Sequence, residues 1–350
     1  MNRELIVVEP RGSARSRPSL TCPEVADAEW DLLSIPMSDP AWNETFLSAA
    51  GDCYDRLVGE GIDPSAYNLQ EMAADVEDLR RALGIEEWNL MTISSASRIA
   101  LEVMDRYPDH VRSATLDSPE FPGDAGFGRA DDATREAVTV MARYCEADPA
   151  CASNYPDVAD ALDEAAARLE ERPIRERITL PDGRPADAVI DGGSLVRFVR
   201  WQMARSRALG GPVADIPALI YDALQGRFVP TFQLESTHAT CIGYNQPCFR
   251  NQWTHGLVFS ELCHDELPFA HPAAAGPGFH EAFGDHPFLD LCRVWNVPPG
   301  DPPRVTRAQV PTLVLAGQLD PDISQPVLED AVAALDPGFL VTFDGLGSNV

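Results

Sequence analysis

One serine lies where the sequence could form a nucleophile. Residues 88–93 are predicted to be a strand and residues 97–107 a helix, so Ser94 falls in the sharp turn between them. A serine on such a strained turn exposes its hydroxyl, and beside a base it attacks acyl groups. Thr92 and Ala96 stand where glycines usually let the chain pass close to the serine. A serine in this place is more often a helix cap, so the turn alone does not establish chemistry.

The elements around Ser94 follow a regular alternation. Asn68 is predicted to cap a helix, with Glu71 completing a capping box and Gly84 ending the helix. The strand and helix on either side of Ser94 come next, and residues 111–116 form another strand. This order is typical of a mostly parallel sheet with helices on its faces.

The two ends of the chain are predicted to add to the same sheet. Leu5 to Val8 is a short β-branched run that indicates a buried strand, and a polar loop is predicted from there to about residue 66. Near the C-terminus, residues 312–316 and 339–343 are predicted strands on either side of a helix at 327–335. The alternation therefore resumes after a long interruption.

The segment that interrupts the alternation differs from it in composition and in predicted elements. Residues 125–300 are rich in predicted helix, loops, cysteine and proline, and a hairpin is predicted at 181–183. We therefore predict one α/β domain, formed by residues 1–124 and 301–350, with residues 125–300 inserted as a mainly helical cap.

The composition excludes some partners. The formal net charge is -28 and the chain contains no lysine, so its surface repels nucleic acid and anionic lipid. A cation such as a free amino terminus would be attracted. The chain has no run of about 18 apolar residues, so no membrane span is predicted.

Short blocks along nearly the whole chain resemble the tripeptidyl and prolyl aminopeptidase branch of the α/β hydrolases. The resemblance implies an α/β-hydrolase fold, with a mostly parallel sheet and an inserted cap. The blocks are Glu9, Arg11-Gly12, Ser16, Pro18 and Cys22-Pro23-Glu24; Tyr67 to Gly84; Trp88-Asn89-Leu90; Ser94 with Ser97 to Leu101; Tyr107 to Val111; Leu116-Asp117-Ser118; Phe259-Ser260, Cys263, Asp265-Glu266 and Pro268-Phe269; Cys292 and Trp295; and Pro311 to Gly317 with Asp320-Pro321.

The resemblance also implies roles for individual residues. Ser94 takes the place of the nucleophile, and Asp320 that of the acid that orients a histidine. The Ser95 backbone N–H would be half of an oxyanion hole. Aminopeptidases of this type hold the substrate's amine with carboxylates of the cap, so Asp265 and Glu266 are candidates for that role.

The site departs from the family at the base. Ser348 stands where the family has its histidine, and a serine cannot accept a proton near neutral pH. All seven histidines precede Asp320, six of them in the predicted cap, where solvated or packed histidines are common. The glycine-rich oxyanion loop is not found before Leu5, so the early strands of the fold are expected to be missing.

We therefore expect a serine hydrolase of the exopeptidase kind, which forms an acyl-enzyme at Ser94 on short peptides or small esters and amides. It should be weak or inactive because Ser348 takes the histidine position and the oxyanion loop is absent. We also expect Thr92 and Ala96 to distort the turn. Two alternatives stay open: a non-catalytic relative that binds peptides or small ligands, and a fragment of a longer hydrolase. We expect a monomer without a cofactor.

The eight cysteines indicate disulfides rather than metal ligands. No CxxC pair occurs, the histidines lack zinc-finger spacing, and no metal site is predicted. An even cysteine count favours an oxidising compartment, hence a secreted or cell-envelope protein, although residues 1–10 do not form a signal peptide. Eight cysteines allow about 105 pairings. Close spacing favours Cys145–Cys151, Cys241–Cys248, Cys263–Cys292 and Cys22–Cys53.

Overall fold

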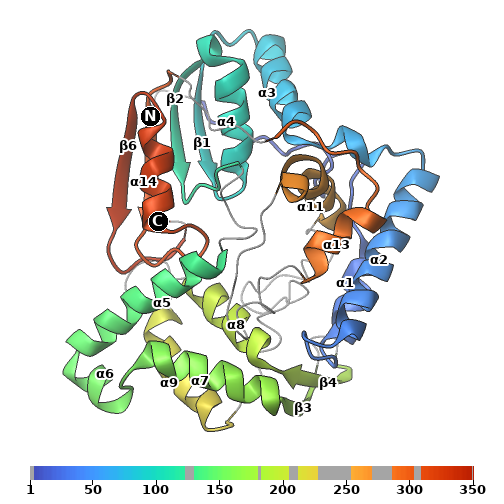
Figure 1. Ribbon diagram of the computed structural model, residues 1–350. Coiled ribbons are helices and arrows are strands. Elements are labelled where there is room, and N and C mark those ends of the chain that lie inside the picture. The colour runs from blue at the N-terminus through green and yellow to red at the C-terminus, as the bar shows by residue number, and fades with distance from the viewer. Residues whose placement is uncertain are drawn as a thin grey trace.

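A four-stranded parallel sheet organises the protein. The computed structural model describes residues 4–122, 130–179, 183–204, 212–227, 254–269, 286–302, 309–348 and 350. The strands run in the order β1 (Trp88–Ile93), β2 (Val111–Asp117), β5 (Thr312–Gly317) and β6 (Gly338–Phe343). All three neighbouring pairs are parallel, as predicted (Figure 1).

The helices between these strands also follow the sequence. In α3 (Leu69–Leu83), Asn68 Oδ1 accepts a hydrogen bond from the Glu71 N–H at 2.9 Å, and Gly84 ends the helix with φ 66°. The strand β1 leads into α4 (Ala96–Arg106), and β5 leads into α14 (Gln325–Ala333). The predicted N-cap at Asn68 and the strand–helix alternation are thus confirmed, whereas the Glu71 carboxylate accepts from Arg11 Nη1 at 3.0 Å.

The two faces of the sheet are covered differently. On one face, Leu101 and Met104 of α4 and Leu328 of α14 pack against Leu116 and Val314. On the other face, several large apolar side chains are exposed. The strand register places Met91, Thr115, Leu313 and Phe339 side by side on that second face. Its exposed members are Met91, Ile93, Phe339, Val341 and Phe343.

Two predictions for the first 66 residues are wrong. Leu5 to Val8 forms no strand; Leu5 is 83% exposed and Val7 81%, and neither pairs with any strand among the described residues. The expected long loop contains α1 (Pro23–Leu32) and α2 (Pro40–Gly59) instead. Both helices begin at a proline, which suits a first turn whose N–H groups have no partner within the helix.

The helices α1 and α2 form a core with the segment that precedes β5. Phe46 of α2 and Trp295 each meet Phe259 of α11 (His255–Glu261) edge-on, with ring centroids 5.7 and 5.3 Å apart. A π-helix (Leu262–Glu266) continues α11, and α13 (His286–Val294) packs against α2. Figure 1 shows these helices as one group beside the sheet.

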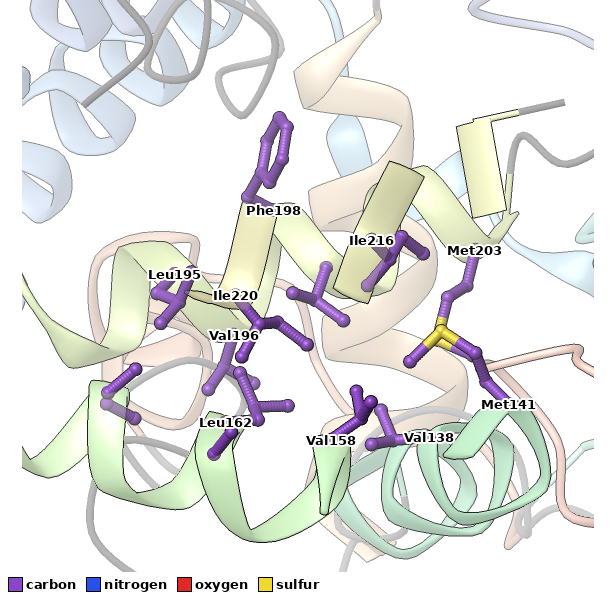
Figure 2. Packing of buried hydrophobic residues seen from close by; sticks show 14 of the residues in the cluster. Val138, Met141, Val158, Leu162, Leu195, Val196, Phe198, Met203, Ile216 and Ile220 are labelled. Atoms are coloured by element: carbon purple, nitrogen blue, oxygen red, sulfur yellow. The ribbon is translucent and has the colours of Figure 1, made fainter. Parts of the chain in front are cut away.

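A second helical group is formed by residues that follow β2 and precede α11 in the sequence. Its elements are α5 (Ala130–Ala147), α6 (Pro149–Asn154), α7 (Val158–Glu171), β3 (Ile174–Thr179), β4 (Pro185–Ile190), α8 (Gly192–Ala204) and α9 (Ile216–Leu224). Figure 2 shows Leu162 of α7 near Val196 and Ile220, and Val158 of α7 beside Val138 of α5. The strands β3 and β4 pair antiparallel, which confirms the predicted hairpin; its residues 180–182 lie outside the described residues.

Three of the predicted disulfides are present. Cys22–Cys53 joins the start of α1 to α2, Cys145–Cys151 joins α5 to α6, and Cys263–Cys292 joins the π-helix to α13. Cys241 and Cys248 lie outside the described residues. Within the described part of the chain, no helix is both long and apolar enough to cross a membrane.

Candidate active site

Ser94 lies in a strained turn at the carboxyl end of β1. Its φ is 55°, a left-handed conformation that is uncommon for residues other than glycine. The Ser94 N–H donates to Asp117 O at 2.9 Å, which ties the turn to the end of β2. The turn thus has the positive φ of a strand-to-helix corner that presents a serine, with Thr92 and Ala96 in place of glycines. Ser95 directly precedes α4, so its N–H lies at the positive end of the helix.

Glu120 is fixed against this turn. The buried Ser97 Oγ accepts a hydrogen bond from the Glu120 N–H at 2.9 Å and lies 3.0 Å from Glu120 O and 2.6 Å from Ser94 O. The Ser94 hydroxyl donates to Glu120 Oε1 at 3.2 Å. One buried hydroxyl therefore holds the backbone of both residues, and the Glu120 carboxylate meets the candidate nucleophile.

Arg98 binds three glutamates next to Ser94. Its side chain is 7% exposed, and its Nη2 lies 2.8 Å from Glu261 Oε1. Its Nη1 lies 3.4 Å from Glu266 Oε1, and its Nε lies 3.6 Å from Glu120 Oε2. We call Arg98, Glu120, Glu261 and Glu266 the Arg98 cluster. Through Glu120, the cluster is joined directly to Ser94.

The cluster holds more negative than positive charge. When ionised, its three carboxylates face one guanidinium, which leaves two negative charges in excess. Burial, opposed by Arg98 and reinforced by Asp265, Glu120 and Glu266, raises the pKa of Glu261 to about 7. Burial disfavours the Arg98 cation, but the glutamates outweigh that effect and raise the pKa of Arg98. The site thus keeps its guanidinium charged.

The two predicted amine-binding residues have different surroundings. Glu266 belongs to the Arg98 cluster. Asp265 instead accepts a hydrogen bond from the Leu69 N–H at 3.0 Å, at the start of α3, and its Oδ1 lies 2.7 Å from His264 Nδ1. Asp265 therefore has a structural partner on each oxygen, whereas Glu266 faces the cation.

Asp320 and Ser348 lie together, as the resemblance implies. Both are buried, at 4% and 5% exposure. Ser348 Oγ donates to Asp320 Oδ1 at 2.9 Å, and the Asp322 N–H donates to the same oxygen at 3.0 Å. The structure thus brings together the two residues that the resemblance pairs, Asp320 and Ser348.

Burial also dominates the electrostatics of this second pair. It raises the pKa of Asp320 to about 7, with a further increase from the neighbouring Asp322. Arg200 of α8 forms an ion pair with Asp322, which links the second helical group to the acid loop. Asp320 is therefore disfavoured as a carboxylate, and an imidazolium that would neutralise it is not part of its described surroundings.

Ser94 and Asp320 share one edge of the sheet. Ser94 follows β1, Asp117 ends β2 and Asp320 follows β5. Asp117 links the two sides because its carbonyl accepts from the Ser94 N–H and its Oδ1 accepts from the Val350 N–H at 3.1 Å. Among the described residues, no hydrogen bond joins Ser94 to Asp320 or Ser348.

One group of described residues has the composition of a metal site. Cys22, Glu24 and Cys53 lie close together, but the two cysteines form a disulfide and so cannot act as thiolate ligands.

The sequence comparison identifies the fold family. The profile of the alpha/beta hydrolase fold family matches residues 3–180, which is half of the chain. The chain belongs to the α/β-hydrolase family. The serine protease Hip1 of Mycobacterium tuberculosis and of Mycobacterium bovis is 25% identical over 374 residues, which cover 98% of this chain and 68% of each relative.

Solved structures are more distant. A proline iminopeptidase from Mycobacterium smegmatis is 16% identical, with coverage of 82% of this chain and 67% of that one and a TM-score of 0.34. Est816, titled an N-acyl homoserine lactone degrading enzyme, is 15% identical, with coverage of 82% and 70% and a TM-score of 0.33. The family assignment rests on the profile match rather than on these superpositions.

Sequence reasoning missed Arg98 and Glu261 as site residues of this hydrolase-family protein. Arg98 lies three positions before the buried Leu101 on α4, so a charged residue on an apolar helix face was a usable signal. Glu261 precedes the candidate Glu266 by five residues, and only the π-helix brings both to Arg98.

Proposed function

We propose that this hydrolase-family protein binds the free amino end of a short peptide or of a small amino ester or amide. The Arg98 cluster would hold the ammonium group, and the acyl carbon would lie near Ser94. Acyl transfer at Ser94 would be weak, because Ser348 takes the place of the histidine. The observation that carries the proposal is the set of three glutamates around one buried arginine, joined to the serine.

The charge of the cluster supports an ammonium ligand. Buried charges are stable only when they are paired, and an uncompensated carboxylate in a protein interior is costly. Glu261 compensates in part by its raised pKa, which lets it stay protonated near neutral pH. An ammonium group would replace that proton with a full positive charge and three hydrogen-bond donors.

The position of the cluster supports an aminoacyl substrate. In an amino acid ester or amide, only the α-carbon separates the amine from the carbonyl carbon. Glu120 contacts the Ser94 hydroxyl at 3.2 Å and Arg98 at 3.6 Å. An amine bound at the cluster would therefore leave the carbonyl carbon within reach of Ser94.

Two further observations agree with this proposal. The serine protease Hip1 aligns with 98% of the chain, and the M. smegmatis protein is described as a proline iminopeptidase. The three disulfides of the described residues favour an oxidising compartment, so we propose a secreted or cell-envelope location.

Isothermal titration calorimetry tests the amine site. Trialanine amide should bind, and N-acetyl-trialanine amide should bind at least tenfold more weakly, because acetylation removes the positive charge. Glu261→Gln should weaken binding of the free amine about tenfold or more, as expected for a hydrogen bond to a charged group. The control Glu102→Gln, which removes the exposed partner of Arg106 on α4, should bind like the unaltered chain.

The pH dependence of peptide binding is a second test of the amine site. Below about pH 7 Glu261 is protonated and the cluster loses a negative charge, so binding should weaken as the pH falls. Above about pH 8 a peptide amino terminus loses its own charge, so binding should weaken again. Equal affinity for the free and the acetylated peptide at every pH would refute the amine site.

A further inference from the structure

We infer that Glu120 is the proton acceptor of Ser94 in this chain. The inference deepens the proposed function at the same serine, but it does not depend on amine binding. It assigns to a carboxylate the role that the family's histidine would have, and it explains why Ser94 would react slowly rather than not at all.

The geometry meets the requirements for a base. Glu120 Oε1 lies 3.2 Å from Ser94 Oγ, within the range for a general base and its proton donor. The other carboxylate oxygen lies 3.6 Å from Arg98 Nε, so a third group orients the base. Ser97 binds the backbone N–H of Glu120 and lies within hydrogen-bonding distance of its carbonyl and of Ser94 O. The base and the nucleophile are therefore held in one rigid turn.

The other titratable groups at this edge are occupied elsewhere. Asp320 Oδ1 accepts from Ser348 and from the Asp322 backbone. The described histidine side chains lie against other carboxylates: His110 against Glu77, His255 against Glu29 and His264 against Asp265. The charged groups that face Glu120 are Arg98 on α4, Glu261 on α11 and Glu266 on the π-helix. Among the described residues, Glu120 is the titratable group hydrogen-bonded to Ser94.

The chemical step is an ordinary acylation with a different base. Ser94 Oγ forms a bond to the acyl carbon, the carbonyl π electrons move to the oxygen, and the hydroxyl proton passes to Glu120 Oε1. When the bond to the leaving group breaks, Glu120 returns the proton to the departing nitrogen or oxygen. Water then hydrolyses the acyl-enzyme by the same route. A carboxylate is a weaker base than an imidazole at neutral pH, so the step is slow.

A fluorophosphonate tests this assignment because it needs no amine. Ser94 Oγ attacks phosphorus, fluoride leaves, and the proton passes to Glu120. The unaltered chain should therefore be labelled at pH 7, and labelling should be lost in Ser94→Ala.

Variants then identify the base. Glu120→Gln should lower the labelling rate at pH 7 about 10²-fold, the lower end of what a general base contributes. The control Glu102→Gln should label at the unaltered rate. Glu120→Asp, which keeps a carboxylate, should label faster than Glu120→Gln. Equal rates for these two variants, or an unaltered rate in Glu120→Gln, would overturn the assignment. Persistent labelling with no preference for free amines in calorimetry would refute the amine site alone.

Discussion

Two groups of buried carboxyl groups lie near the same edge of the sheet, and they differ in what neutralises them. In the Arg98 cluster, three glutamates surround a guanidinium that is 7% exposed. At the acid loop, Asp320 is bound by the Ser348 hydroxyl and a backbone N–H, and its pKa is raised to about 7. The first group has an excess of negative charge around a fixed cation, whereas the second has an acid with a neutral partner.

Because of this difference, the residues proposed to bind an amine can be considered apart from those that a family hydrolase uses for catalysis. A family hydrolase needs its acid to stabilise a positively charged histidine, and Ser348 cannot carry that charge. The Arg98 cluster needs nothing from the acid loop, because its arginine and its link to Ser94 come from α4, Glu120 and the segment 261–266. The proposed amine site and the Asp320–Ser348 pair are therefore formed by separate contacts.

The largest expected effect concerns the single cation of the cluster. Arg98→Met should lower the free energy of unfolding by about 3–5 kcal/mol, because it leaves buried carboxylates without their partner. Denaturant unfolding measures this change. Arg106→Met on the same helix breaks the exposed pair with Glu102 and should cost less than about 1 kcal/mol. Equal losses of unfolding free energy in the two variants would show that the Arg98 cluster stabilises the protein no more than an exposed ion pair does.

The disulfides of the two helical groups should differ in how much they contribute to the free energy of unfolding. Replacing Cys263 and Cys292 with alanine opens a loop with a sequence separation of 29, and should cost about 3–4 kcal/mol. Replacing Cys145 and Cys151 opens a separation of only 6, and should cost about 2 kcal/mol. A reducing agent should lower the thermal midpoint accordingly. Eight free thiols by mass spectrometry in exported protein would contradict the disulfide assignment.

The sequence predicted the elements with strong local signals. Asn68, Glu71 and Gly84 mark the ends of α3, and the β-branched runs mark the strands of the sheet. Leu5 to Val8 has the same composition, but no strand lies beside it in the described structure and its side chains are exposed. A β-branched run is therefore buried only where another strand pairs with it, and composition alone does not reveal that partner. The helices α1 and α2 were missed; α1 packs against α2, and α2 packs against α11 and α13, which are distant in the sequence.

The site was predicted only where a motif existed. The resemblance led to Ser94, Asp320 and Ser348 through local patterns, and the structure brings the last two together. Arg98 and its glutamates come from three segments of the chain, and no spacing rule relates them. Only folding places Glu261 2.8 Å from Arg98.

The acid loop should respond to pH in a direction that follows from its pKa. Between about pH 4 and about pH 7, the folded chain holds the Asp320 proton more tightly than the unfolded chain, so this contribution to stability is lost as the pH rises through that window. Asp320→Asn cannot ionise and keeps an oxygen for Ser348. It should therefore be more stable than the unaltered chain at pH 8 by about 1 kcal/mol, with less advantage at pH 4. Thermal unfolding at both pH values measures this. No pH dependence in the difference would contradict the raised pKa.

The smallest expected effect is the change in turnover when a histidine is placed at position 348. Ser348→His should raise turnover of an aminoacyl p-nitroanilide by less than about tenfold, because the Ser94 hydroxyl is directed to Glu120 rather than to position 348. The matched control is Ser348→Ala. An increase of about 10³-fold or more would show that a base was the only part missing.

The most direct test of the account uses one substrate for both properties. Alanine p-nitroanilide should bind the unaltered chain with saturation in calorimetry, while p-nitroaniline is released at or near the rate without protein. N-acetyl-alanine p-nitroanilide should show neither binding nor release. Turnover of about 1 s⁻¹ or faster, the range of ordinary enzymes, or failure of the free amine to bind would contradict the account.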